Sequence, residues 1–220
     1  MVDFRPFRPL IPRLGNGEAM IERVSPPYDI ISAEELAILR SQRYNVTNIT
    51  LGGVDGDYAQ AGKLLAAWLE EGALAQDRRD SFYVYKQTFC QGEHCWQRTG
   101  LIGIMAARGY ADEVVPHEET YPKVKEDRLN LLRGTETHCE SIFGIFDEIS
   151  ARVKDLIEDQ ETKVLEFTDH QEVRHCLYRV CDPETVKAIS EELRGKSVLI
   201  ADGHHRFETA SRYAQENVGE

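Results

Sequence analysis

The chain has 220 residues, 41% of them hydrophobic, which is enough to bury one sizeable core or two small ones. Its formal net charge of −12 argues against the basic surface that binds a nucleic-acid backbone, so we expect no nucleic-acid partner. No apolar run reaches the roughly 18 residues of a membrane span, and residues 1–13 lack the apolar segment of a signal peptide, so we expect a cytoplasmic protein with no membrane partner.

The first 30 residues are rich in proline, and helices follow them. Proline fixes the backbone angle φ and removes a hydrogen-bond donor, so residues 4–29 are predicted to form an extended, irregular arm. Ser32 and Glu35 have the spacing of a helix capping box and predict a helix over residues 32–43. A second helix is predicted over residues 57–71, where an apolar stripe ends at Gly72.

The pattern changes to strands after residue 81. The runs 82–85 and 96–106 are rich in β-branched and aromatic residues and predict a hairpin that turns at Gly92. The odd cysteine count and the lack of a secretion signal favour reduced thiols throughout. We expect no zinc site around the turn, because no second Cys/His pair has the spacing of a zinc finger. The cysteines are Cys90, Cys95, Cys139, Cys176 and Cys181.

The second half of the chain alternates between helix and strand patterns. Asp182 and Pro183 have the order of an N-cap followed by the first helical residue, and they predict a helix that runs to residue 193. The short apolar run 197–201 is typical of a buried strand. The other predicted elements are helices at 124–133 and 206–216 and strands at 141–146 and 173–180. This mixed order predicts an α+β (mixed α/β) fold.

The segment Asp202-Gly203-His204-His205-Arg206 lies where the last predicted strand gives way to a helix. Free backbone N–H groups at such a junction attract anions, and the imidazoles and guanidinium add donors for phosphate oxygens. Asp202 would repel phosphate unless it holds a metal ion or accepts a proton, which favours chemistry beyond binding. The alternative is structural, with Asp202 as a helix cap and the histidines as surface donors.

A second polar segment runs from Pro116 to Pro122 and leads into the predicted helix at 124–133. His117, Glu118 and Thr120 precede a face of that helix that carries Lys125 and Arg128. A carboxylate for a hydroxyl proton near cations for a phosphate suits phosphoryl transfer. The alternative is a solvated helix held by salt bridges.

Several motifs together resemble the bacterial and archaeal domain-of-unknown-function 1015 family. The resemblance spans nearly the whole chain. Members of that family are normally longer, and the last predicted helix is followed by no closing strand, so we expect the chain to continue beyond Glu220. The motifs are Phe4-Arg5-Pro6-Phe7-Arg8, Pro26-Pro27-Tyr28-Asp29, Phe82-Tyr83-Val84-Tyr85, Thr99-Gly100-Leu101, His117-Glu118-x-Thr120, Lys125-x-Asp127-Arg128, Ser141-Ile142-Phe143-Gly144 and Ala201-Asp202-Gly203-His204-His205-Arg206.

Two of these motifs also resemble the free-serine kinases of the ParB/sulfiredoxin superfamily. That resemblance implies that Glu118 lies near the substrate hydroxyl as a candidate base and that Asp202 assists it or holds Mg²⁺. It implies a nucleotide-phosphate cradle formed by Gly203, His204, His205 and Arg206, with His117, Thr120, Lys125 and Arg128 in support.

The same resemblance implies a ParB/sulfiredoxin-like core in residues 111–220, with an insertion at about 134–196. Residues 1–110 are then an additional N-terminal α/β region with the arm, helices and hairpin.

Three functions are compatible with these patterns. The first is a kinase that uses ATP or ADP with Mg²⁺ and phosphorylates a small hydroxyl compound, free L-serine being the best single candidate. The second is a nucleotide-binding switch without transfer chemistry. The third is an interaction protein whose polar loops are structural, which binding of a nucleotide would contradict.

Overall fold

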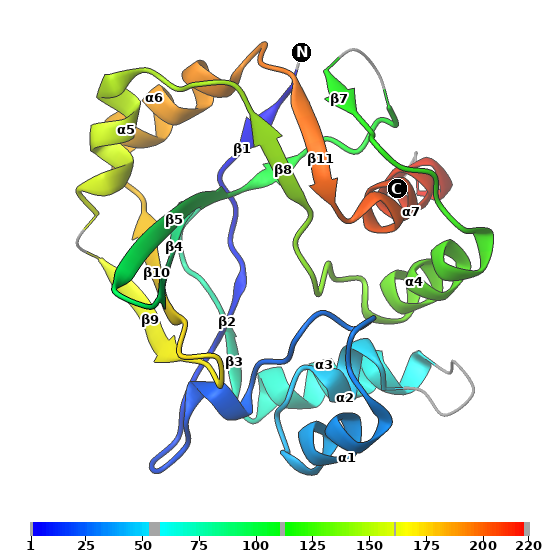
Figure 1. Ribbon diagram of the computed structural model, residues 1–220. Coiled ribbons are helices and arrows are strands. Elements are labelled where there is room, and N and C mark those ends of the chain that lie inside the picture. The colour runs from blue at the N-terminus through cyan, green and yellow to red at the C-terminus, as the bar shows by residue number, and fades with distance from the viewer. Residues whose placement is uncertain (1, 53–57, 111–112, 161, 218–220) are drawn as a thin grey trace.

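The computed structural model describes residues 2–52, 58–110, 113–160 and 162–217, and it shows a mixture of helices and small sheets (Figure 1). The predicted α+β class is therefore confirmed. The predicted start of a helix at residue 57, the predicted division at residues 110–111 and the last residues of the chain reach outside the described ranges. No helix in the described ranges is both long enough and apolar enough to cross a membrane.

The largest sheet has the strand order β5-β4-β10-β9, and all its neighbours are antiparallel. β4 (Phe82–Gln91) and β5 (His94–Ile102) form the predicted hairpin, while β9 (Lys163–Thr168) and β10 (Arg174–Val180) come from much later in the chain. Two helices, α5 (Ala151–Glu158) and α6 (Pro183–Leu193), bury their apolar residues against Phe82, Val84 and Val180. This sheet therefore ties the two halves of the sequence together.

The hairpin corrects one prediction made from the sequence. Cys90 of β4 and Cys95 of β5 are paired directly opposite each other, and they form a disulfide. The prediction of reduced thiols is wrong for this pair, because the register of the hairpin brings two cysteines separated by only a short turn into contact. Cys139, Cys176 and Cys181 are free thiols.

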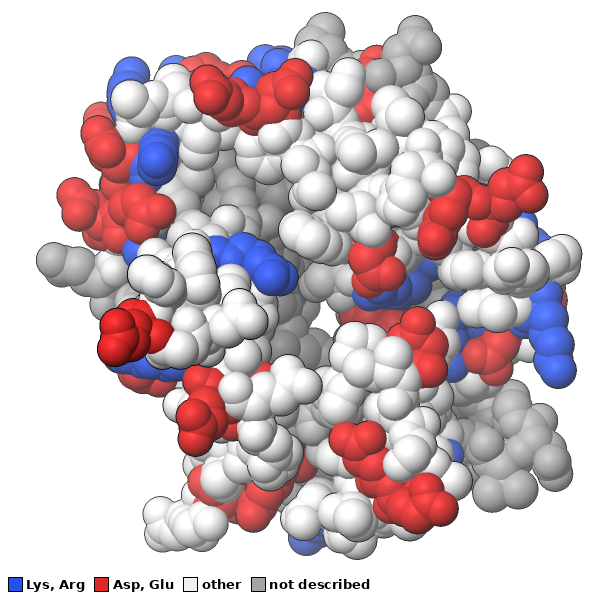
Figure 2. All heavy atoms as spheres, in the orientation of Figure 1, with Lys and Arg blue, Asp and Glu red and all other residues white. Residues whose placement is uncertain are grey.

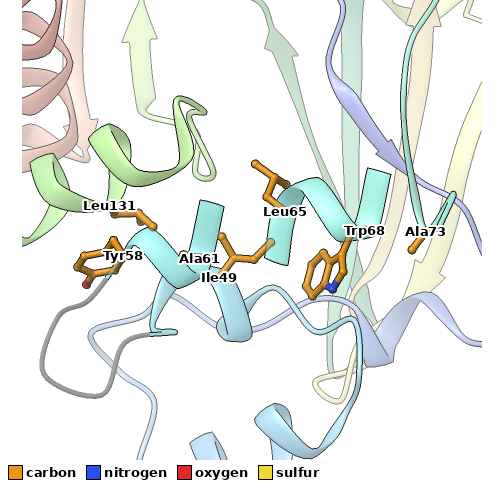
Figure 3. Close-up of a cluster of buried hydrophobic side chains, with 7 residues drawn as sticks. All are labelled: Ile49, Tyr58, Ala61, Leu65, Trp68, Ala73 and Leu131. Atoms are coloured by element: carbon orange, nitrogen blue, oxygen red, sulfur yellow. The ribbon is translucent and has the colours of Figure 1, made fainter. Parts of the chain in front are cut away.

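A second core lies among helices α2 (Thr47–Thr50), α3 (Ala59–Glu70) and α4 (Pro122–Thr135). Helix α1 (Ala33–Ser41) contacts α2 and contributes no buried residue to this core. Figure 3 shows Leu65 and Trp68 of α3 and Leu131 of α4 among its members. Helices α3 and α4 approach very closely, since a Cβ atom added to Gly62 would lie 2.0 Å from the carbonyl oxygen of Gly134. The lack of side chains at Gly62 and Gly134 allows this close crossing, which fixes the position of α4. Helix α4 carries part of the second polar motif.

The third core supports the predicted turn at Asp202. β11 (Val198–Asp202) is the central strand of a three-stranded sheet, parallel to β7 (Val114–Val115) and antiparallel to β8 (Phe143–Phe146). Ile200 of β11 and Phe207 of α7 (His204–Glu216) are buried in this core. The parallel pairing of β7 with β11 brings the loops that follow both strands to the same edge of the sheet.

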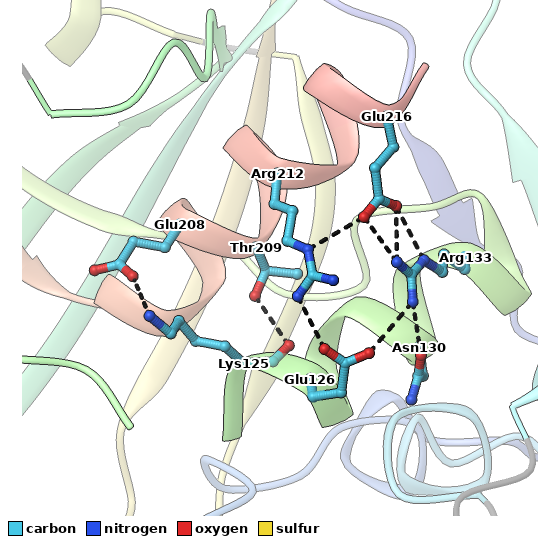
Figure 4. Close-up of polar contacts among 8 residues, drawn as sticks. All are labelled: Lys125, Glu126, Asn130, Arg133, Glu208, Thr209, Arg212 and Glu216. Carbon is cyan, nitrogen blue, oxygen red and sulfur yellow. Dashed lines mark hydrogen bonds and ion pairs between the residues drawn. The ribbon is translucent and has the colours of Figure 1, made fainter. Parts of the chain in front are cut away.

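Helices α4 and α7 lie side by side and are joined by a row of polar contacts (Figure 4). Arg133 of α4 forms an ion pair with Glu216 of α7, and Arg212 of α7 forms one with Glu126 of α4. Lys125 and Glu208 extend the row toward the start of α7. The helices that carry the two polar motifs are therefore held together along their length.

The N-terminal arm is extended and irregular, as predicted. Its short strands β1 (Phe4–Arg5) and β2 (Leu10–Pro12) pair with β6 (Ile104–Met105) and β3 (Leu74–Gln76). One turn of 3-10 helix follows at Met20–Glu22. The arm thus runs along the molecule from the core beside the three-stranded sheet to the core among helices α2, α3 and α4 (Figure 1).

Candidate functional site

The turn between β11 and α7 has the backbone that an anion site needs. Gly203 occupies the N-cap position with φ +93°, a left-handed conformation that glycine adopts without strain. No side chain caps the helix, and Phe207 is the first residue whose N–H bonds back into the turn, to the carbonyl oxygen of Gly203. The N–H groups of the first turn therefore have no partner within the helix, and they lie at the positive end of a 13-residue helix.

Arg206 folds back over this turn. Its Nη2 donates to Asp202 Oδ2 at 2.6 Å, and its Nη1 donates to the carbonyl oxygen of Ser141. A Cβ atom on Gly203 would lie 3.0 Å from the guanidinium, so the missing side chain makes room for it. Asp202 therefore ends the strand as the ion-pair partner of Arg206 and is not the helix cap of the structural alternative.

The second motif meets the turn through two histidines. His204 is completely buried, and its Nε2 accepts a hydrogen bond from the backbone N–H of His117 at 3.2 Å. His117 in turn donates from Nδ1 to the carbonyl oxygen of Ile200 at 2.7 Å. Because Nε2 of His204 acts as an acceptor, the proton of the neutral ring lies on Nδ1.

Glu118 lies next to that proton. Nδ1 of His204 is 3.0 Å from Oε1 of Glu118, whose side chain is half exposed. The angles of this contact are not those of a hydrogen bond, so Nδ1 is a buried polar atom without a hydrogen-bond partner among the described residues. The structure thus brings Glu118 and the α7 turn into contact through His204.

Two further contacts fasten the loop of the second motif to α7. His205 Nε2 accepts from the backbone N–H of Tyr121 at 2.9 Å. Glu208 Oε2 accepts from both Thr120 Oγ1 and Lys125 Nζ at 2.8 Å. Burial alone would raise the pKa of Glu208, but these two donors more than offset burial and hold that pKa below its usual value. Thr120 and Lys125 therefore position the loop against the helix.

One large cavity, of about 1630 Å³, opens beside the turn. Figure 2 shows the hollow near the middle of this face, with both acidic and basic side chains around it. The predicted site residues that line it are Glu118, Asp202, Gly203, His205 and Arg206. Its described lining does not include His117, Thr120, Lys125, Arg128 or the buried His204. The candidate base Glu118 and the Asp202-Gly203 turn therefore line one cavity.

Arg128 lies beneath this cavity rather than on an open basic face. Its Nε and Nη2 donate to Asp127, and Nη2 also donates to the hydroxyl of Tyr58 at 3.0 Å. Burial raises the pKa of Tyr58 to about 12, so that hydroxyl stays protonated and donates to Asp127. The ring of Tyr28 covers the guanidinium at 4.7 Å. The Arg128 side chain is only 4% exposed, yet its Nη1 has no hydrogen-bond partner among the described residues.

The structure adds residues to the site that reasoning from the sequence did not select. Tyr28 and Asp29 of the arm and Glu140 before β8 line the same cavity. Burial raises the pKa of Glu140, while Arg206 and Arg128 partly oppose that rise. The resemblance motif Pro26-Pro27-Tyr28-Asp29 was a signal for the first two residues. No sequence signal pointed to Glu140, because single carboxylates in loops are common.

The carboxylates around the turn were also considered as a metal site. Asp202 is the exposed carboxylate nearest the α7 N-terminus, with Asp29 and Glu140 on the same cavity. Within the described ranges no group of three or more metal-binding side chains is close enough together to hold an ion. A Mg²⁺ ion at Asp202 would therefore take its remaining ligands from water and from nucleotide phosphates, as Mg²⁺ commonly does.

A comparison with protein families matches residues 4–220 to the family described as "Protein of unknown function (DUF1015)". Comparisons with curated proteins and with solved structures found no match. Because the family match covers almost the whole chain, the chain belongs to the DUF1015 family.

Proposed function

We propose that this member of the DUF1015 family transfers a phosphoryl group from a nucleotide to a small hydroxyl compound, with free L-serine as the best single candidate for the acceptor. The observation that carries the proposal is the shared cavity, which is lined by Glu118 on one side and by the Asp202-Gly203 turn on the other. Phosphoryl transfer depends mainly on positioning and electrostatics, so a carboxylate and an anion-binding turn in one cavity are the parts it needs.

The proposed roles follow from exposure. Glu118 is half exposed and can accept a proton from the substrate hydroxyl, while buried His204 orients it. The N–H groups at the start of α7, with His205 and Arg206, cradle the phosphates of ATP or ADP. Asp202 is the proposed Mg²⁺ ligand.

The proposal extends to fold and location. We propose a ParB/sulfiredoxin-like core in residues 111–220, interrupted at about 134–196, with residues 1–110 as the additional region. We also propose a cytoplasmic protein that acts on small molecules rather than on nucleic acid or membranes, and the acidic composition supports the exclusion of nucleic acid.

The test is an assay of the 220-residue chain with ATP or ADP, Mg²⁺ and L-serine, with phosphoserine detected by mass spectrometry. Glu118→Gln should reduce turnover about 100-fold or more, because a positioned general base contributes about that factor. Glu126→Gln makes the same change in charge at a half-exposed residue of α4 that pairs with Arg212 of α7 and does not line the cavity, so it serves as the control.

Three results are informative. Turnover that is lost in Glu118→Gln and retained in Glu126→Gln supports the proposal. Nucleotide binding without any acceptor-dependent product over a broad panel of hydroxyl compounds would leave a nucleotide-binding switch. Neither turnover nor a thermal shift with ATP, ADP or CTP would favour an interaction protein instead.

A further inference from the structure

A small second cavity lies directly beside the large one. Its volume is about 40 Å³, several times the roughly 10–15 Å³ needed for one water molecule, so it can hold a group the size of a carboxylate. Thr137, His138, Cys139, Glu140 and Arg206 line both cavities. The small cavity is therefore a side pocket of the proposed active site.

Two charged groups in this side pocket lack adequate partners. Arg128 uses Nε and Nη2 for Asp127 and Tyr58, and its buried Nη1 has no hydrogen-bond partner among the described residues. A buried, unpaired guanidinium N–H is costly unless a ligand supplies an acceptor. Arg128 lines the small cavity, so that acceptor would come from a molecule bound there.

Glu140 lacks a close cationic partner. Arg206 is its one ion-pair contact among the described residues, and Nε of that arginine is 3.9 Å away, beyond hydrogen-bond distance. The other nitrogens of Arg206 are already engaged with Ser141 and Asp202. Glu140 is thus a largely buried carboxylate that lacks a strong donor. It suits a cationic group of a ligand.

We propose that the side pocket binds the headgroup of a free α-amino acid, with the carboxylate on Nη1 of Arg128 and the ammonium group on Glu140. A purely anionic ligand would be repelled by Glu140, and a purely cationic one would leave Nη1 of Arg128 unpaired, so a zwitterion satisfies both groups. This inference rests on the proposed function for the reaction, and it narrows the acceptor from hydroxyl compounds in general to hydroxy-amino acids.

The position of the pocket fits that role. Arg206 touches both Glu140 and Asp202, so one guanidinium separates the pocket from the phosphate turn. The side chain of an amino acid held by its headgroup would extend from the pocket toward the large cavity, where Glu118 and the start of α7 lie. A hydroxyl on a short side chain would therefore reach the region of the proposed transfer.

The test is isothermal titration calorimetry of the wild-type chain with four ligands that differ by one group. L-Serine has every group, L-alanine lacks the hydroxyl, ethanolamine lacks the carboxylate and 3-hydroxypropionate lacks the ammonium group. We expect L-alanine to bind within about threefold of L-serine. The other two should bind at least about tenfold more weakly, because each leaves a buried charged group unpaired.

Variants locate the binding. Arg128→Lys and Glu140→Gln should each weaken binding of L-alanine by at least about tenfold. Arg133→Lys should not change that binding, because Arg133 of the same helix pairs with Glu216 of α7 and lines neither cavity. Circular dichroism and thermal denaturation check folding. If Arg128→Lys fails to fold, Glu140→Gln and the four ligands still test whether the side pocket binds an amino-acid headgroup.

The outcomes separate this inference from the proposed function. Equal binding of ethanolamine or 3-hydroxypropionate, no binding of L-serine and L-alanine, or wild-type affinity in a folded Arg128→Lys or Glu140→Gln variant would overturn the amino-acid pocket. Binding of L-alanine with the expected losses, but no phosphorylated product from any hydroxyl compound of the panel with ATP or ADP, would keep the pocket and refute the kinase. Turnover of alcohols without amino-acid binding would keep the kinase and refute the amino-acid pocket.

Discussion

Gly203→Ala is the substitution that most directly tests how the proposed phosphate-binding turn between β11 and α7 is built. At φ +93° an alanine is strained by about 1–2 kcal/mol, and the restriction that alanine places on the unfolded chain offsets about 0.4–1 kcal/mol of that strain. The new Cβ would also lie 3.0 Å from the guanidinium of Arg206 and displace it from Asp202. That ion pair is largely solvent-exposed on the side of Asp202, so its loss adds at most about 1 kcal/mol.

Gly17→Ala is the matched control, because Gly17 has φ +81° and no atom within 4 Å of its added Cβ. Urea denaturation of both variants should give a loss of about 1 kcal/mol for Gly17→Ala and about 1–2 kcal/mol for Gly203→Ala. The thermal shift with ATP or ADP and Mg²⁺ should persist in Gly17→Ala and disappear in Gly203→Ala. Equal stability of the two variants, together with a normal nucleotide shift in Gly203→Ala, would refute this account of the turn.

Three further substitutions test the charges and the packing around the site. Burial raises the pKa of Glu140 in the folded state, so the free energy of unfolding of the wild type falls as pH rises through that pKa. In urea denaturation, Glu140→Gln should therefore be more stable than wild type at pH 7 and equally stable below pH 4. Glu208 has a lowered pKa, so its stabilisation is present at neutral pH and is lost as pH falls through the folded value. Acid unfolding of Glu208→Gln should therefore depend less steeply on pH, and a slope equal to wild type would contradict this. Gly62→Ala should destabilise by about 1–3 kcal/mol, measured by thermal denaturation, because its Cβ would collide with the backbone of Gly134; an unchanged melting temperature would show that α3 and α4 do not cross there.

Local sequence patterns identified most of the elements that have clear ends. The prediction from Ser32 is confirmed, since its side chain accepts from Glu35 N at the start of α1. Asp182 likewise caps α6 with Pro183 in its first turn, as predicted. In both cases the deciding interaction joins residues three apart, so it is visible in a short window of sequence.

Elements that depend on distant partners were missed or misplaced. β9 is an edge strand with a half-exposed, partly charged sequence, and it is defined by its pairing with β10 rather than by hydrophobic alternation. The predicted strand 96–106 is interrupted at Gly103, where the rings of Phe4 and Phe82 leave no room for a side chain. The helices α2 and α5 are short, and no prediction covered them.

The geometry around the candidate site could be read from the sequence only where it is local. The strand-to-helix junction at Asp202 was visible locally, but the helix begins at His204 and not at Arg206 as predicted. Successive helical residues point about 100° apart, so His204 turns into the core while His205 faces the cavity. Their different surroundings could not be read from two identical neighbours. Neither could the contact with Glu118, which joins residues far apart in the chain.

The ion pair between Arg206 and Asp202 is compatible with the proposed phosphate-binding role of Arg206. Asp202 is 69% exposed, so water competes well for its carboxylate, and the pair contributes little to stability. A phosphate at the start of α7 would offer Arg206 a stronger, more buried acceptor next to free backbone N–H groups. Because Gly203 leaves the guanidinium room to move, Arg206 can exchange Asp202 for phosphate at small cost while Ser141 still holds its other nitrogen. The turn is thus held in shape by an ion pair weak enough to be replaced.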